Sequence, residues 1–490
     1  MAARFQFRSL PAARSVVAAD VRRLSSEFRR EPSLLTSAAT KSDPQRGAIL
    51  IVTLLIMAVL ALALTSYVSL NLNSSRLAQR GFQQAAAFNL AEAGAEEALW
   101  SFNQANAGSA SAWNDWMLAS GAAKRQFTGF ALGSATGSVK VYVDNYAPTG
   151  SARPSVVALS TVEATGGASV TKMVEVTLRR RSRFSAGLMA KDTITFNGNR
   201  ASVDSWNSDP DNDSSTAPVA YSSSTRNDRG SVASVAVDTR KVLVNQADVY
   251  GYVYTGGAPP IVGEEGSIKG RDTPADTRID PARVATDFSA TFPDVAAPLD
   301  GTVLTALPAT LGTAGTATKW RCPNLSLSGK ETLTIYGDVT LVLTGGTGTH
   351  TIDVTGQASI VITADSSLTV YSEGDMLIGG NGLANNNTRP STCLIYGTNT
   401  GASGQRIQIV GNGALKAALY APNADITING NGDIYGGAVG NTITLTGRAE
   451  FHYDESLENL DSGMPFGVDA WREITTGDAR AAQQSKFTGW

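Results

Sequence analysis

A run of apolar residues, QRGAILIVTLLIMAVLALALTSYVSL, constrains this chain more than any other feature and extends from Gln45 to Leu70. No charged residue occurs between Arg46 and Arg76. Because a helix rises about 1.5 Å per residue, about 20 apolar residues span the roughly 30 Å hydrocarbon core of a bilayer. The run therefore predicts a membrane-spanning helix.

The residues that follow indicate that this helix continues beyond the membrane. SSRLAQRGFQQAAAFNLAEAGAEEALWSFNQA comes directly after the run, and no proline occurs in residues 47–100. A removed secretory signal has a shorter apolar region followed by a non-helical start. The pattern favours a retained anchor with an amphipathic outer half. The basic residues before the run place its N-terminus in the cytoplasm.

Two segments, RGAILIVTLLIMAVLALALTSYV and AAAFNLAEAGAEEALW, resemble the N-terminal region of PilX-type minor pilins and pilus-assembly proteins. The most specific part is AEAG, Ala91 to Gly94. In that family a prepilin peptidase removes a basic leader that ends in glycine, and the retained helix packs with other pilin helices. The resemblance implies cleavage between Gly47 and Ala48, pilin or pseudopilin partners, and a bacterial inner-membrane location with extracytoplasmic C-terminal domains.

Two positions differ from major pilins, which start with an aromatic residue and carry glutamate at the fifth mature position. Here these positions are Ala48 and Val52. A buried carboxylate is tolerated only when it is paired, so a subunit without it lacks that contact with its neighbour. The differences predict a minor or initiating subunit. An ordinary single-pass anchor is the alternative for this segment, and a start site assigned too early is the alternative for the long leader.

After the helix the sequence changes to strand patterns. GSVKVYVDNYA, SVVALSTVEATGG and ASVTKMVEVTLRRR alternate polar and apolar residues and end in turns, which predicts a small antiparallel pilin-like sheet on the helix. From residue 185 onward, short Ile, Val, Thr and Leu runs are separated by Gly and Asn at a spacing of about 18 residues. Such runs bury a core only when stacked, which predicts a right-handed β-solenoid; a β-sandwich is the alternative.

The predicted fold class is therefore mainly β, with a long N-terminal helix, a small antiparallel sheet and a large β-solenoid. Proline is frequent in the interval that separates the two solenoid segments, and Trp471 lies in a tail expected to cover the end of the stack. The predicted segments are a leader at 1–46, the helix at 47–100, a small α/β region at 101–184, a first solenoid segment at 185–270, a proline-rich excursion or linker at 271–324, the main solenoid at 325–455 and the covering tail at 456–490.

Composition and motifs exclude several functions. A net charge of -3 provides no basic face for nucleic acid. The sequence lacks GxSxG, Walker, CxxC and HExxH motifs, so it predicts no enzyme and no cofactor. A polysaccharide-active β-helix enzyme is the alternative, because parallel β-helices often carry such activity. Cys322 and Cys393 are candidates for a disulfide in an exported protein.

Two acidic clusters in the sequence are candidate binding sites. In DPDND, the alternating carboxylates of Asp209, Asp211 and Asp213 resemble the opening of a calcium loop. Ser214 replaces the required glycine and Ala220 the bidentate glutamate, so Ca²⁺ is a weak candidate and a solvated loop is the alternative.

The second cluster is EFHYDE, at residues 450–455. Strand alternation places Glu450, His452 and Asp454 on one face and Glu455 on the other. We interpret this segment as a surface strand with polar neighbours rather than a catalytic site. The whole chain predicts a minor pilin that displays its solenoid for adhesion to a surface glycan or protein ligand. A simple membrane-tethered surface protein is the remaining alternative.

Overall fold

The computed structural model describes residues 45–148, 152–164, 168–198, 201–213, 215–379, 381–401, 404–411, 415–430, 433–460 and 464–488. Residues 1–44 of the predicted leader at 1–46 lie outside these ranges. The described chain is mainly β, with one long N-terminal helix and two sheets. It divides into two compact units, Met1–Arg80 and Gly81–Trp490.

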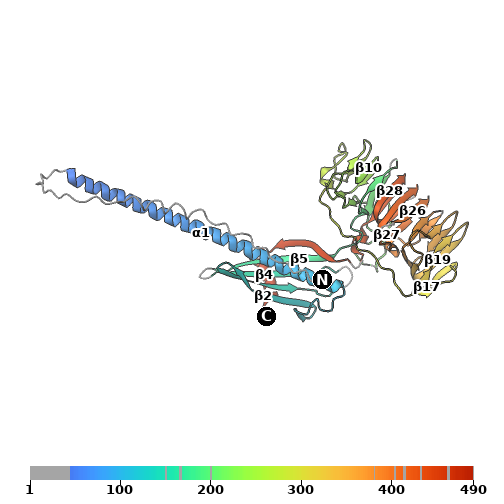
Figure 1. Ribbon diagram of the computed structural model, residues 1–490, viewed down its shortest axis with the longest axis horizontal. Coiled ribbons are helices and arrows are strands. Elements are labelled where there is room, and N and C mark those ends of the chain that lie inside the picture. The colour runs from blue at the N-terminus through green and yellow to red at the C-terminus, as the bar shows by residue number, and fades with distance from the viewer. Residues whose placement is uncertain are drawn as a thin grey trace. The chain divides into compact units, whose positions relative to one another are not determined.

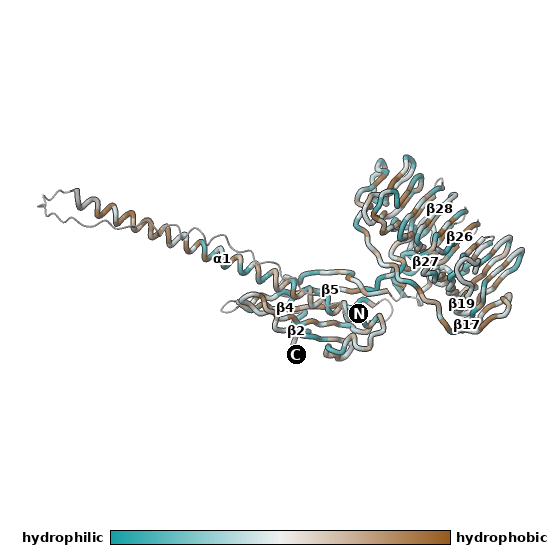
Figure 2. Tube along the Cα trace, viewed as in Figure 1, coloured by the Kyte–Doolittle hydropathy of each residue, from teal (hydrophilic) through white to brown (hydrophobic). Residues whose placement is uncertain are grey.

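Helix α1 (Gln45–Asn106) contains the apolar run. Its most apolar window has a mean hydropathy of 2.5 and is 0% buried, so the helix is long and apolar enough to cross a membrane. Figure 2 shows these hydrophobic residues along the first part of α1. The Thr53 and Thr65 hydroxyls donate to the carbonyls of Leu50 and Ala61, at 2.9 and 2.7 Å. These two threonine hydroxyls are therefore satisfied within the helix itself, as a lipid environment requires.

An antiparallel sheet packs on the C-terminal part of α1. Its strand order is β1-β2-β3-β4-β5-β30. The three runs predicted from alternation form β3, β4 and β5. The six strands are β1 (Met117–Ala119), β2 (Ala122–Leu132), β3 (Ala135–Val143), β4 (Ser155–Ala164), β5 (Val170–Arg180) and β30 (Phe466–Glu473).

Small residues allow α1 to approach this sheet closely. Ala91 and Ala95 are buried in the interface with the valines of β3. A Cβ added at Gly94 would lie 2.8 Å from a methyl carbon of both Val139 and Val141. Real Cβ contacts are not that short, so only glycine fits here without displacing the sheet. The AEAG block is therefore the close-packing face of the helix.

The C-terminal tail is where one prediction is wrong. Residues 456–490 were expected to cover the end of the stacked strands, but β30 pairs antiparallel with β5 at the edge of the other sheet. The Trp471 ring packs edge-on against Phe88 of α1 at 5.6 Å. Asn103 also bonds both backbone groups of Phe466, at 2.6 and 3.3 Å. Helix α2 (Gly477–Gln484) follows. The tail completes the small sheet because β5 otherwise leaves an unpaired edge.

The second sheet is a stack of parallel strands. Among the described residues these strands form three columns, and within a column each strand pairs with the strand of the next coil. Figure 1 shows β19, β26, β27 and β28 as arrows of this stack. The long strands β17 (Thr310–Cys322), β19 (Thr332–Leu343), β27 (Leu415–Gly430) and β28 (Ile434–Gly447) each pass through more than one column.

The shorter strands each belong to one column. The first column contains β6 (Leu188–Ala190), β9 (Val232–Ser234), β12 (Val253–Thr255), β15 (Val284–Ala285), β16 (Thr302–Val303), β22 (Ser367–Ser372) and β25 (Cys393–Gly397). The second contains β7 (Ile194–Phe196), β10 (Val242–Asn245), β13 (Ile261–Val262), β18 (Leu325–Leu327), β20 (His350–Val354), β23 (Asp375–Ile378) and β26 (Gln405–Gly411). The third contains β8 (Ser202–Trp206), β11 (Asp248–Tyr250), β14 (Ser267–Lys269), β21 (Ser359–Ile362), β24 (Gly382–Asn385) and β29 (Glu450–Asp454).

The chain enters this stack in the middle rather than at an end. The chain first forms β6, β7 and β8, and it then winds away from this coil through β9 to β15. After the interval that follows β15 it resumes at β16 and winds back until β29. The last coil closes on the first, since β28 pairs with β6 at Ala438 and Leu188, and β29 pairs with β8 at His452 and Asp204. The two arms of the chain therefore share one hydrophobic core.

Part of the predicted proline-rich interval belongs to the stack. The strands β15, β16 and β17 lie within it, and β17 pairs with β19. Residues 271–283 and 286–301 contain no strands, and the second of these, the crossing segment, lies against the first column. The Tyr420 hydroxyl donates to the Pro293 carbonyl, and the Asn423 amide donates to Asp294, both at 2.9 Å. Proline suits such a segment because it has no N–H to offer a strand ladder.

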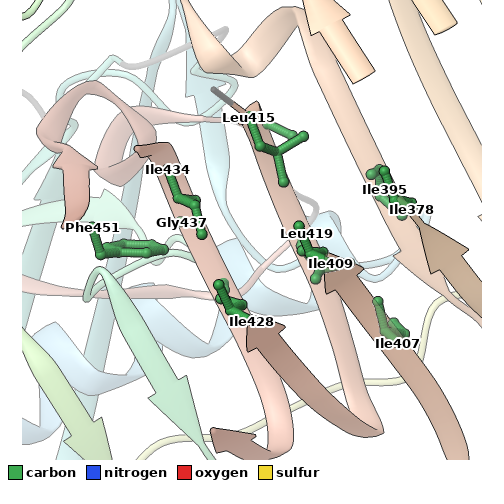
Figure 3. A pocket seen from close by; sticks show the side chains of 12 residues that line it. Ile378, Ile395, Ile407, Ile409, Leu415, Leu419, Ile428, Ile434, Gly437 and Phe451 are labelled. Atoms are coloured by element: carbon green, nitrogen blue, oxygen red, sulfur yellow. The ribbon is translucent and has the colours of Figure 1, made fainter. Parts of the chain in front are cut away.

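The interior of the stack is apolar and tightly packed. Alternate side chains of each strand point inward, as in β22 and β23. Figure 3 shows the space between the later coils, lined by Ile395, Ile407, Leu419, Ile428 and other side chains. Its volume is only about 10 Å³. This is the lower limit for one water molecule, so the core offers no ligand cavity here.

The predicted disulfide is wrong. Cys322 and Cys393 are both free and buried. They lie on β17 and β25 of the first column, and β19 and β22 separate these strands. Three strand spacings amount to about 14 Å, twice the roughly 7 Å Cα limit of a disulfide. Burial raises the pKa of the Cys322 thiol to about 11 and of the Cys393 thiol to about 12. Both cysteines therefore act as core side chains.

Candidate functional site

The exposed apolar surface of α1 is the first candidate site. Leu50, Leu54 and Met57 are more than half exposed, as is Val52. Gly47 and Ala48 fall near the start of α1, and their side chains are outside the described residues. A continuous apolar helix surface of this kind needs lipid or other helices to cover it.

A polar cluster on the third column is the second candidate site, and its centre is His452 of β29. The alternation predicted for this strand is correct, since Phe451 and Tyr453 point into the core. The polar neighbours predicted for this strand are present, but its predicted surface position is wrong at His452, whose side chain is only 1% exposed. Its Nδ1 lies 2.6 Å from Oδ1 of Asp204, on the neighbouring strand β8.

Aromatic rings cover His452 and account for its burial. The Tyr221 ring, from the segment between β8 and β9, lies over the imidazole with centroids 3.9 Å apart. The Tyr435 ring of β28 lies on the adjacent coil at 4.8 Å. Tyr221 and Tyr435 also pack against Trp206. A strand that faces outward is therefore enclosed by the excursion between β8 and β9.

Asp204 is held by more than the imidazole. The Tyr221 hydroxyl donates to its Oδ2 at 2.8 Å, and Nε of Arg226 forms an ion pair with the same oxygen at 2.8 Å. Burial raises the pKa of Tyr221 far above its ordinary value, and the hydrogen bond to Asp204 adds to this rise. Tyr221 therefore remains a protonated donor at neutral pH. The carboxylate is fixed from three directions, which also fixes the imidazole.

Two further carboxylates approach the other side of His452. One oxygen of Asp433, one of Glu450 and one ring nitrogen of His452 all lie within 4.8 Å of one another. The distance from Nε2 to the Glu450 carboxylate is 3.9 Å. The Tyr435 hydroxyl donates to Oδ2 of Asp433 at 3.1 Å. Burial, followed by the charge of Asp433, raises the pKa of Tyr435 to about 12. Histidine and carboxylates are metal ligands, so this trio can hold a cation.

A small pocket lies beside the cluster. It has a volume of about 110 Å³ and is lined by Trp206, Ala220, Tyr221, Thr388, Lys416 and Tyr435. Lys416, Tyr435, His452 and Asp204 occupy successive coils in register. The pocket therefore follows the same outward row of side chains as the polar cluster.

The other acids of EFHYDE have structural roles. Asp454 accepts hydrogen bonds from the backbone N–H groups of Ser208 and Ser456 at 3.0 and 3.1 Å. Burial raises the pKa of Asp454, although these bonds oppose the rise. Glu455 accepts from the hydroxyl of Ser205 at 2.8 Å. Both side chains join β29 and the turn after it to β8.

The three aspartates of the calcium candidate do not converge. Asp209 forms an ion pair with Arg389 at 3.5 Å. Asp211 and Asp213 accept hydrogen bonds from their own turn, and they are not among the metal-type groups found in the described part of the chain. Ser214 lies outside the described residues. Hydrogen bonds donated by the hydroxyl and the backbone N–H of Ser215 lower the pKa of Asp213.

Sequence reasoning missed the partners of His452. Two of these partners, Asp204 and Tyr221, are far from His452 in the sequence. Asp433 is nearer but belongs to no recognisable motif, so no local spacing indicates that it meets His452. The only available signal was the outward position of Asp204 in SVDSW. The pairing of β29 with β8 appears only when the two arms of the stack close on each other.

The chain shares limited similarity with known proteins. A family model described as a domain of unknown function (DUF7305) matches residues 320–460, which cover the later coils of the stack. No curated protein gives a significant match. Among solved structures, the ice-binding protein 1 DUF3494 domain of Shewanella frigidimarina is similar at 13% identity and a TM-score of 0.24. That match covers 55% of this chain and 94% of the other. Similarity at this level assigns neither a fold nor a function to this chain.

Proposed function

We propose that this chain is a minor-pilin-like component of a type IV pilus or pseudopilus. The N-terminal helix anchors it in the bacterial inner membrane, and a prepilin peptidase cuts between Gly47 and Ala48. The helix then packs with other pilin subunits. The single observation that carries the proposal is α1, whose apolar half is fully exposed and whose other half packs on an antiparallel sheet through a stripe of Ala and Gly.

The proposal assigns the stacked strands to a right-handed β-solenoid outside the cytoplasm. The parallel register of neighbouring coils supports a solenoid over a sandwich, since sandwich strands pair mainly antiparallel. Right-handed winding is the general preference for parallel crossovers. The stack presents an extended surface for adhesion or for contact with a glycan or protein partner.

One observation favours the alternative of a polysaccharide-active enzyme. Asp433 and Glu450 approach each other closely enough for paired carboxylate chemistry. The neighbouring pocket has a volume of about 110 Å³. Ligand pockets usually enclose about 300 Å³ or more, so the assembly role is the better-supported function.

The N-terminus of the mature protein tests the proposal. The full chain is expressed with a prepilin peptidase, purified from membranes and sequenced from its N-terminus. We expect Ala48 as the first residue, and we expect a Gly47→Leu variant to keep its leader. A matched Gly81→Leu variant, in an open part of the same helix, should be processed normally. An uncut leader in the unmodified chain would instead identify a simple membrane anchor.

A further inference from the structure

The geometry around His452 separates its two ring nitrogens. Nδ1 is 2.6 Å from the buried carboxylate of Asp204, which can only accept a hydrogen bond when ionised. Nδ1 therefore carries the proton in the neutral ring, and Nε2 carries the lone pair. Nε2 faces Glu450 and lies 3.9 Å from the Glu450 carboxylate. Metal-binding histidines are commonly oriented by such a carboxylate on the opposite nitrogen.

The backbone holds the three potential donor groups in place. Glu450 and His452 are two residues apart on β29 and so share one side of the strand. Asp433 directly precedes β28. The first residue of β28, Ile434, pairs with Phe451, which lies between Glu450 and His452 in the sequence. Neighbouring coils thus deliver two carboxylate oxygens and one imidazole nitrogen to one point. The ligand atoms come within 4.8 Å of one another without any rearrangement of the strands.

The charge at this point is uncompensated. Among the described residues, neither Asp433 nor Glu450 forms an ion pair with lysine or arginine, whereas Arg226 neutralises Asp204. Two carboxylates at this separation repel each other unless a cation or a proton lies between them. The Glu450 side chain is 56% exposed, so an ion can reach the group from solvent. The buried His452 forms the floor of this opening.

From this arrangement we infer that Asp433, Glu450 and His452 bind one divalent transition-metal ion of the Zn²⁺ class. Nε2 and two carboxylate oxygens form a mixed N/O donor set, which suits Zn²⁺ better than the all-oxygen sites of Ca²⁺ or Mg²⁺. The two carboxylates balance the charge of the ion. Three protein ligands leave a coordination position open to water or to a partner's side chain. Asp204 and Tyr435 orient the ligands and do not contact the ion.

Direct titration of the metal-free protein tests this site. The full chain without an affinity tag, in detergent, is dialysed against a chelator and titrated calorimetrically with Zn²⁺ alone. We expect one saturable site per chain, and we expect Co²⁺ at the same site to give visible ligand-field absorption typical of low coordination number. Glu450→Gln and Asp433→Asn keep the shape of each side chain and should each weaken Zn²⁺ binding by about 10-fold or more, as loss of a supporting metal contact does.

The matched control is Glu264→Gln, an exposed carboxylate on another part of the stack, which should bind Zn²⁺ as the unmodified chain does. Circular dichroism and tryptophan fluorescence confirm that each variant is folded. The inference is overturned if the unmodified chain shows no saturable Zn²⁺ site. It is also overturned if Glu450→Gln and Asp433→Asn bind with unchanged affinity, because the ion would then lie elsewhere.

Discussion

Replacement of Gly230 by alanine tests whether the return of the chain to the stack depends on close backbone contact. Gly230 lies two residues before the first residue of β9, and its N–H donates to the Tyr250 carbonyl at 3.0 Å. A Cβ built on Gly230 would lie 2.6 Å from Cα of Asp204 and 2.8 Å from its backbone nitrogen. Carbon atoms in contact normally lie about 3.5–4.0 Å apart. The two backbone segments must therefore separate by about 1 Å.

That movement has two costs. Overpacking against a rigid backbone costs about 1–3 kcal/mol, because no side-chain rotation relieves it. The same shift stretches the Gly230–Tyr250 hydrogen bond beyond useful length, and an unpaired buried group costs about 1–3 kcal/mol. We expect Gly230→Ala to lower the free energy of unfolding by roughly 2–6 kcal/mol. Since Asp204 holds His452, the variant should also disturb the polar cluster.

Equilibrium unfolding in guanidinium chloride measures this change through the fluorescence of the buried Trp206. Gly346→Ala is the matched control, because no atom lies within 4 Å of its added Cβ. The control should change the free energy of unfolding by no more than about 0.5 kcal/mol. If the two variants unfold within about 1 kcal/mol of each other, the close contact is not a stabilising constraint and the reasoning is wrong.

Two further predictions concern the tail and the segment after β29. Phe466→Ala removes a buried ring that packs on Phe102 at 5.0 Å. It should lower the free energy of unfolding by about 3–5 kcal/mol and open the tail to limited proteolysis. Val468→Ala, at an exposed position of the same strand, should leave the digestion pattern unchanged. Burial raises the pKa of the Glu458 carboxyl above its ordinary 4.5, although the Arg229 guanidinium opposes this rise. The folded protein then holds the proton more tightly, so its free energy of unfolding falls as pH rises from 4.5 through the raised pKa. Glu458→Gln should flatten that part of a thermal-stability profile, and an unchanged slope would contradict the assignment.

Local patterns in the sequence predicted several elements correctly. The uninterrupted apolar run is part of α1, and three alternating runs became β3, β4 and β5. These elements are readable because their hydrophobic periods, 3.6 and 2, directly reflect helix and strand geometry. Gly94 of the AEAG block also has a local reason, since it lies on the helix face that meets the sheet.

Other predictions failed because they depended on long-range order. The predicted linker at 271–324 contains β15, β16 and β17 of the stack, and the predicted cover at 456–490 contains β30, the edge strand of the other sheet. Both errors came from an assumption that consecutive segments occupy consecutive positions in space. The chain instead enters the stack in its middle, and short strand patterns contain no information about which coil follows which.

The sequence by itself determined the membrane-length helix and the β character of the remaining chain. Each of these follows from the order of neighbouring residues. The tertiary structure alone decided the separation of Cys322 from Cys393 and the meeting of Asp204, Asp433 and His452. Such distances depend on the pairing of β28 with β6 and of β29 with β8. Pairing between distant segments is set by the shared core that closes the two arms of the stack, and only the folded chain contains that core.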